Sequence, residues 1–112
     1  MTRDLDYVRN FLLELESEGD YALRGFHHET SDKEMNHILI MADAGLLVKQ
    51  GKYEYRITWQ GYDYLDAVRD DENWRKTKAG LAKIGGGTFE IVKELATAYI
   101  KQSAMEKLGI NL

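Results

Sequence analysis

The stretch from Ser31 to Gly61 constrains the fold more than any other part of this sequence. Ser31 and Glu34 have the spacing of a capping box, which predicts that a helix begins here, and Gly45 is placed to end that helix. The residues after Gly45 are rich in β-branched and aromatic side chains and contain a glycine turn, a pattern typical of a β-hairpin. The segment therefore predicts a helix over 32–44 followed directly by two antiparallel strands.

Amphipathic helices are expected on both sides of this hairpin. Residues 4–18 carry apolar side chains at helical spacing behind an Asp4 cap and before Gly19. After the hairpin, Gly61 separates the second strand from a further helix that begins at Tyr62. Two more helices are expected over 70–83 and 88–107, and Thr88 is expected to cap the last one.

This order of elements is typical of winged helix-turn-helix domains, in which the hairpin is the wing. A short strand over 21–24 would complete the small sheet, although residues 19–30 show no obvious helix. The expected fold is α+β, mostly α, with a winged-helix-like core over residues 1–70. A C-terminal helical extension over 71–112 is expected to pack on this core, so that the chain forms a single domain overall.

Several short motifs occur together in this chain. They are Arg3–Asp6, Ala44–Leu47, Ile57–Gly61, Leu65–Trp74 and Gly85–Glu90. As a set they resemble a family of small phage and prophage proteins catalogued as a domain of unknown function. The resemblance implies a phage or prophage origin and a winged-helix-like core, and it brings no catalytic residues.

The charged and polar residues predict neither an enzyme nor a cofactor site. The chain has no cysteine, and its three histidines, His27, His28 and His37, lack the spacing of zinc ligands. The acids at 70–72 are expected to cap a helix, and Gly85–Gly87 lacks the lysine of a phosphate-binding loop. No nucleophile, base and orienting group occur together. The N-terminus carries acid without a long apolar run, so a soluble, cytoplasmic protein is expected.

One hypothesis is that the chain is a DNA-binding transcriptional regulator that uses the 32–44 helix and the 48–58 wing. The helix is expected to bury Met35, Ile38, Leu39 and Ala42 and to present Lys33, Asn36, His37 and Ile40 to a groove. The wing would hold the DNA backbone through Lys49, Lys52 and Arg56. Against this, the helix has a net charge of −2 and the chain one of −4, whereas phosphate contacts dominate DNA affinity.

The other hypothesis is a protein-binding platform for a host or phage protein. Five aromatic residues crowd the hairpin and the turn after it: Tyr53, Tyr55, Trp59, Tyr62 and Tyr64. Most are expected in the core, and the remainder would suit an interface, because aromatic residues are enriched at binding hot spots. The acidic helix over 4–20 would suit a nucleic-acid mimic.

The 88–107 helix is apolar on more than one side, which in so small a chain predicts packing against a second copy. A homodimer through this helix is therefore expected, with Ile91, Leu95, Ala98 and Tyr99 as its candidate contacts.

Overall fold

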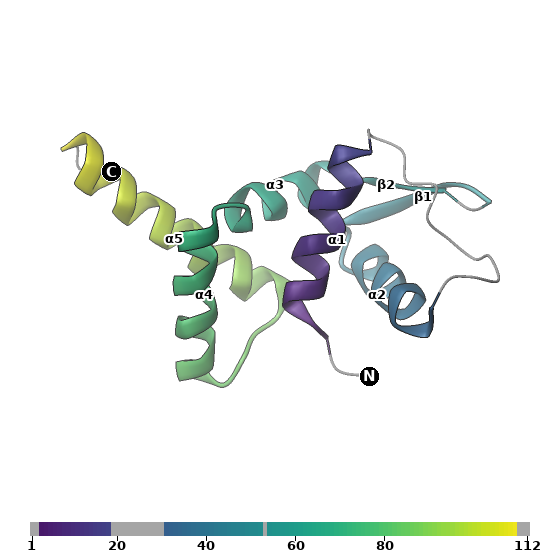
Figure 1. Cartoon of the computed structure of the whole chain (residues 1–112), viewed down its shortest axis with the longest axis horizontal. Coiled ribbons are helices and arrows are strands. Elements are labelled where there is room, and N and C mark those ends of the chain that lie inside the picture. The colour runs from purple at the N-terminus through teal and green to yellow at the C-terminus, as the bar shows by residue number, and fades with distance from the viewer. Residues whose placement is uncertain (1–2, 19–30, 53, 110–112) are drawn as a thin grey trace. The chain divides into compact units, whose positions relative to one another are not determined.

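The computed structural model describes residues 3–18, 31–52 and 54–109. Over these ranges the chain forms five α-helices and one antiparallel hairpin (Figure 1), which confirms the α+β, mostly α class. The chain divides into two compact units, residues 1–65 and 66–112. No helix within the described ranges is both long enough and apolar enough to cross a bilayer.

Over its described residues, the first unit contains two complete helices, the hairpin and the start of a third helix. The two complete helices begin at the predicted caps, Asp4 and Ser31. The Asp4 carboxylate accepts from the Tyr7 N–H at 3.0 Å, and the Ser31 hydroxyl accepts from the Glu34 N–H at 3.1 Å. The elements are α1 (Leu5–Ser17), α2 (Asp32–Asp43), β1 (Leu47–Gly51), β2 (Glu54–Ile57) and the start of α3 (Trp59–Val68). The buried apolar side chains come from all of these elements and from Leu46, which lies between α2 and β1: Val8, Phe11, Leu12, Leu15, Ile38, Met41, Leu46, Leu47, Tyr55, Ile57, Tyr64 and Leu65.

The predicted hairpin is confirmed, and its register decides which side chains face outward. Leu47 pairs with Ile57, and both are buried. The next pair, Val48 and Arg56, lies on the opposite face because side chains alternate along a strand, and both residues are exposed. The strand expected over 21–24 and the predicted stop at Gly19 lie outside the described residues.

A close junction joins the end of α2 to the start of α3. The Thr58 hydroxyl donates to the Gly45 carbonyl and accepts from the Gly61 N–H at 2.9 Å, so Thr58 caps α3. The Thr58 N–H donates to the Leu46 carbonyl at 3.0 Å. A Cβ atom on Gly61 would lie only 2.1 Å from that carbonyl oxygen.

The prediction that a helix begins after Gly61 is therefore wrong. The helix α3 begins at Trp59, and Gly61 lies in its first turn. The glycine is there because the backbone at Leu46 approaches too closely for any side chain, and not because the chain breaks at that point.

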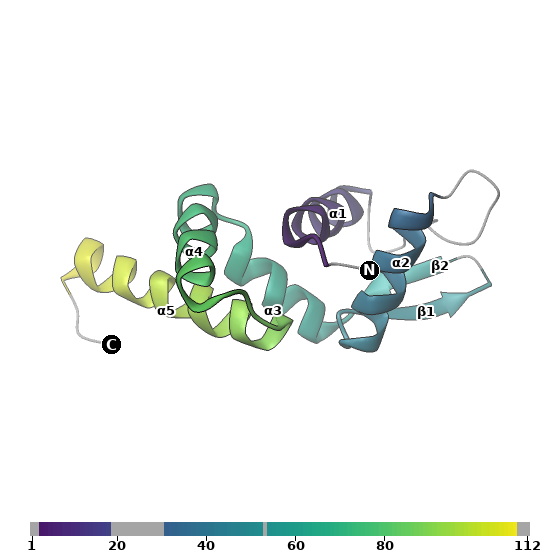
Figure 2. The ribbon, with the colours of Figure 1, turned by 90° about the horizontal axis from the view of Figure 1, so that it is seen from below.

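The second unit contains α4 (Asp71–Ile84) and α5 (Phe89–Leu108), which contact each other. Both begin at predicted caps: Asp70 accepts from the Asn73 N–H at 2.9 Å, and Thr88 accepts from the Ile91 N–H at 3.2 Å. Figures 1 and 2 show that α5 crosses α4 and continues beyond it. The buried residues are Trp74, Thr77, Leu81, Phe89, Val92 and Ala96. Ile84, the last residue of α4, is 62% exposed.

Candidate functional site

The four residues of α2 predicted to face a partner have very different environments. Asn36 is exposed and Ile40 is half-buried. Lys33 is exposed, but its Nζ forms an ion pair with Asp4 Oδ2 at 2.9 Å and lies 4.9 Å from the centroid of the Tyr7 ring. His37 is 1% exposed. Of these four side chains, Lys33 and Asn36 are exposed, and Lys33 is paired with Asp4.

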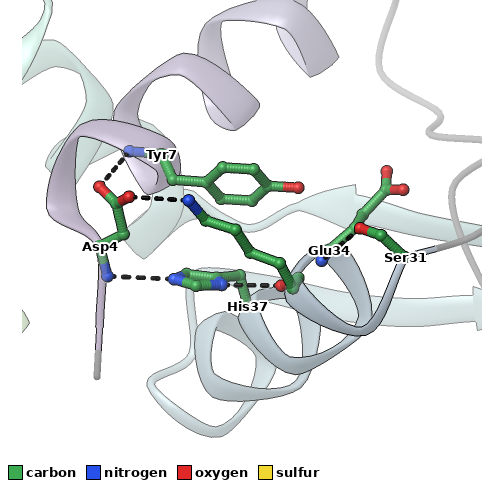
Figure 3. A network of polar contacts seen from close by, with 6 residues as sticks. Asp4, Tyr7, Ser31, Glu34 and His37 are labelled. Carbon is green, nitrogen blue, oxygen red and sulfur yellow. Dashed lines mark hydrogen bonds and ion pairs between the residues drawn. The ribbon is translucent and has the colours of Figure 1, made fainter. Parts of the chain in front are cut away.

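The prediction that His37 faces outward is wrong. Its Nε2 atom lies 3.0 Å from the Asp4 backbone nitrogen, and its Nδ1 atom lies 2.7 Å from the Lys33 carbonyl oxygen (Figure 3). The ring also packs 4.7 Å from that of Tyr7. Both ring nitrogens have backbone partners, so the imidazole is buried between the start of α1 and the first turns of α2 without losing hydrogen bonds.

The tautomer of His37 follows from these two partners. A backbone N–H can only donate, so Nε2 accepts from Asp4, and a carbonyl can only accept, so Nδ1–H donates to Lys33. The histidine joins two helices that are 33 residues apart in sequence at this point.

The buried face of α2 is rotated relative to the prediction. Ile38 is buried as expected, but its buried neighbours are His37 and Met41. Leu39, expected in the core, is 41% exposed, while Met35 and Ala42 are half-buried. An apolar side chain therefore stands on the outer face of α2, where the DNA-binding hypothesis requires polar groups.

The hairpin presents the predicted basic residues. Lys49, Lys52 and Arg56 are all exposed. Val48, the cross-strand partner of Arg56, is 38% exposed. The outer face of the hairpin thus combines an apolar side chain with a guanidinium group.

Of the five aromatic residues around the hairpin, Trp59 is exposed: 81% of its surface is accessible. Tyr55 and Tyr64 are buried, Tyr62 is half-buried, and Tyr53 lies outside the described residues. The inward positions of α3 repeat from Gly61 through Tyr64, Leu65 and Val68, a helical stripe. Trp59 lies two residues before Gly61, which puts it on the opposite side of the helix. The Thr-x-x-Gly spacing, with Thr58 as the cap, was the sequence signal that could have identified it.

Two of the four candidate dimer residues pack within the second unit. A Cβ on Gly80 of α4 would lie 2.9 Å from Leu95 Cδ2 and 3.0 Å from Tyr99 Oη, so both side chains face α4. Ile91 and Ala98, in contrast, are exposed. Leu95 and Tyr99 therefore stabilise the α4–α5 pair.

No group of three or more metal-ligating side chains occurs within residues 3–18, 31–52 and 54–109. His27 and His28 lie outside those ranges.

The family of the chain is shown by comparison with known proteins. A family model described as "Hypothetical protein (DUF2513)" matches residues 2–88, from α1 through α4. The chain belongs to this family. A protein of Haemophilus influenzae, described as uncharacterized, is 29% identical over 115 residues, which cover 91% of this chain and 98% of that protein. No solved structure matches the chain. The predicted resemblance to a domain of unknown function is confirmed.

The environment of Asp4 predicts an acid-dependent stability. Its hydrogen bond from Lys33, assisted by the Tyr7 N–H, holds the pKa of the carboxyl below its ordinary value of 3.8. A carboxyl with a lowered folded-state pKa stabilises the fold above the unfolded value, and this contribution is lost as the pH falls through the folded-state pKa. We expect the urea midpoint of the wild type to fall more steeply below pH 4 than that of Asp4→Asn, which keeps the cap and loses the charge.

The size of this effect is small because the Lys33–Asp4 ion pair is exposed to solvent. Asp43→Asn, at the exposed end of α2, is the matched control and is expected to keep the wild-type slope. If the urea midpoint of Asp4→Asn fell below pH 4 as steeply as that of the wild type, the lowered pKa of Asp4 would be contradicted.

Proposed function

We propose that the first unit is a non-enzymatic protein-binding module of a phage or prophage accessory protein, and that its core is winged-helix-like. The observation that carries this proposal is the 81% exposure of Trp59 at the first position of α3. Tryptophan and arginine are the residues most enriched at binding hot spots.

The surface that would contact the partner consists of Val48, Arg56 and Trp59, here called the hairpin–α3 surface. Val48 and Arg56 are neighbours across the hairpin, and Trp59 follows three residues after Arg56. The Thr58 hydroxyl joins α3 to Gly45 at the end of α2. The indole is therefore attached to a fixed helix start, which limits the conformational entropy lost on binding.

The outer face of α2 supports a protein partner over DNA. Lys33 is held by Asp4, His37 is buried, and Leu39 is 41% exposed. The helix has a net charge of −2, which opposes phosphate binding. We place the partner among the proteins of a bacterial host or of the phage itself, in the cytoplasm.

Replacing Trp59 with alanine is expected to abolish partner capture while changing the free energy of unfolding by less than about 0.5 kcal/mol, because the side chain is exposed. The measurement is a pull-down from host lysate with the wild type, Trp59→Ala and Ile84→Ala. Ile84 is 62% exposed in the second unit and serves as the control for a loss of exposed apolar surface. A protein that is captured by Ile84→Ala and the wild type but not by Trp59→Ala supports the proposal.

Equal capture by both variants would contradict the proposed surface. The alternative function is a DNA-binding regulator. It is supported by the exposed basic residues of the hairpin, Lys49, Lys52 and Arg56. The test is binding to duplex DNA at about 50 mM salt. If this binding weakens steeply as salt rises and is lost in the Lys49→Glu, Lys52→Glu double variant, the DNA-binding function replaces the protein-binding proposal.

A further inference from the structure

The second unit carries a long helix with one side turned toward α4 and another side uncovered within the unit. Phe89, Val92 and Ala96 are buried, and Leu95 and Tyr99 face α4 at Gly80. At about 1.5 Å per residue, the 20 residues of α5 extend about 30 Å, whereas the 14 residues of α4 extend about 21 Å. The α4 helix therefore covers only part of α5, as Figure 2 also shows.

The uncovered side of α5 has the spacing of a coiled-coil seam. Steps of three and four residues alternate along it, and every member is exposed or half-buried. We call this the outer seam of α5: Ile91, Glu94, Ala98, Lys101, Met105 and Leu108. The seam has apolar side chains at both ends and one acid and one base around a central alanine.

The middle of this seam is hollowed. A shallow depression of ≈ 430 Å³ is lined by the small residues Thr97 and Ala98 together with charged residues on either side, Glu90, Lys93, Glu94 and Lys101. Small side chains between larger ones leave room for a side chain from another helix.

The charges of Glu94 and Lys101 favour a second copy of α5 as the partner and an antiparallel orientation of the two helices. In a parallel pair of α5 helices, Glu94 would face Glu94 and Lys101 would face Lys101, and like charges repel. In an antiparallel pair centred near Ala98, Glu94 of one copy lies within about one turn of Lys101 of the other. The same contact forms twice because of the two-fold symmetry. The apolar ends also come together, because Ile91 of one copy then lies opposite Met105 of the other.

We propose that the chain forms an antiparallel homodimer through the outer seam of α5, with two symmetric Glu94–Lys101 ion pairs. This proposal is independent of the hairpin–α3 surface, which lies in the first unit.

The test is the mass of the full chain by light scattering, measured over a concentration series. The wild type is expected near 26 kDa at micromolar concentration, twice the 12.9 kDa of one chain. Glu94→Lys alone and Lys101→Glu alone each create two like-charge contacts and should raise the dissociation constant of the dimer by about tenfold or more. The double variant restores opposite charges and should restore the dimer.

Glu106→Lys is the matched control, because it makes the same charge reversal on an exposed position of α5 outside the seam. It should leave the dissociation constant unchanged. A wild-type mass of 12.9 kDa at all concentrations would overturn the proposal. A double variant weaker than either single variant would also overturn it. Circular dichroism of each variant shows that α5 is still folded.

The absence of cysteine from the chain allows a separate test of direction. An Ala98→Cys variant places the two thiols near the two-fold axis and should form a disulfide-linked dimer on mild oxidation. A Leu108→Cys variant places them at opposite ends of the antiparallel pair, beyond disulfide distance. Efficient crosslinking through position 108 would show a parallel arrangement and contradict the proposal.

Discussion

Replacing Gly61 with alanine is expected to destabilise the first unit by about 3 kcal/mol or more. The added Cβ would lie 2.1 Å from the Leu46 carbonyl oxygen, 3.0 Å from the Leu46 carbonyl carbon and 2.7 Å from Ile57 Cγ2. Two of these three atoms are backbone, so no change of rotamer relieves the overlap. The Leu46 oxygen also accepts the Thr58 N–H at 3.0 Å, and moving it breaks this hydrogen bond between the residue before β1 and the residue after β2.

Urea denaturation followed by far-UV circular dichroism measures this effect, and hydrogen exchange of the hairpin amides locates it. Gly51→Ala is the matched control, since a Cβ there would meet only the flexible side chain of Glu54, at 3.6 Å. Its unfolding free energy is expected to change by less than about 0.5 kcal/mol. If both variants were equally stable, the α2–α3 junction would be more adaptable than its geometry indicates.

The features predicted from sequence are those that depend on neighbouring residues. Asp4, Ser31, Asp70 and Thr88 each accept a backbone N–H three residues ahead, as their positions before apolar runs predict. The hairpin was predicted from its turn and its β-branched residues. Both kinds of signal act over a few residues, so one sequence is enough to detect them.

The features that could not be predicted from the sequence depend on contacts between residues far apart in the chain. The sequence favours a break at Gly61, because no residue near it in sequence indicates how closely the Leu46 backbone approaches. With the start of α3 predicted at Tyr62, Trp59 lies outside the helix and its outward position is not predicted. That position follows once Thr58 is recognised as the cap of α3. Helical spacing alone predicts Leu95 and Tyr99 as dimer contacts, because it does not show that Gly80 of α4 lies against them.

His37 shows the same limit for a polar residue. Its polarity favoured an outward position, but its partners are the backbone of Asp4, from another helix, and that of Lys33. Periodicity separates polar from apolar residues, and it does not show which polar side chain finds buried partners.

Replacing His37 with alanine is therefore expected to destabilise the first unit by about 3 kcal/mol. The substitution removes a ring that is 1% exposed and leaves the Asp4 N–H without its acceptor. His37→Phe separates the two contributions, because it keeps a ring against Tyr7, 4.7 Å from the present imidazole, and removes only the hydrogen bonds. Its expected cost is about 2 kcal/mol.

Urea denaturation at neutral pH measures both variants against Asn36→Ala, the adjacent exposed position on α2, which should change stability by less than about 0.5 kcal/mol. Imidazole ¹⁵N chemical shifts of the wild type give an independent readout. They should show the proton on Nδ1, because the Lys33 carbonyl accepts there and the Asp4 N–H donates to Nε2. A His37→Phe variant as stable as the wild type, or a proton found on Nε2, would show that the histidine does not join α1 to α2 in this way.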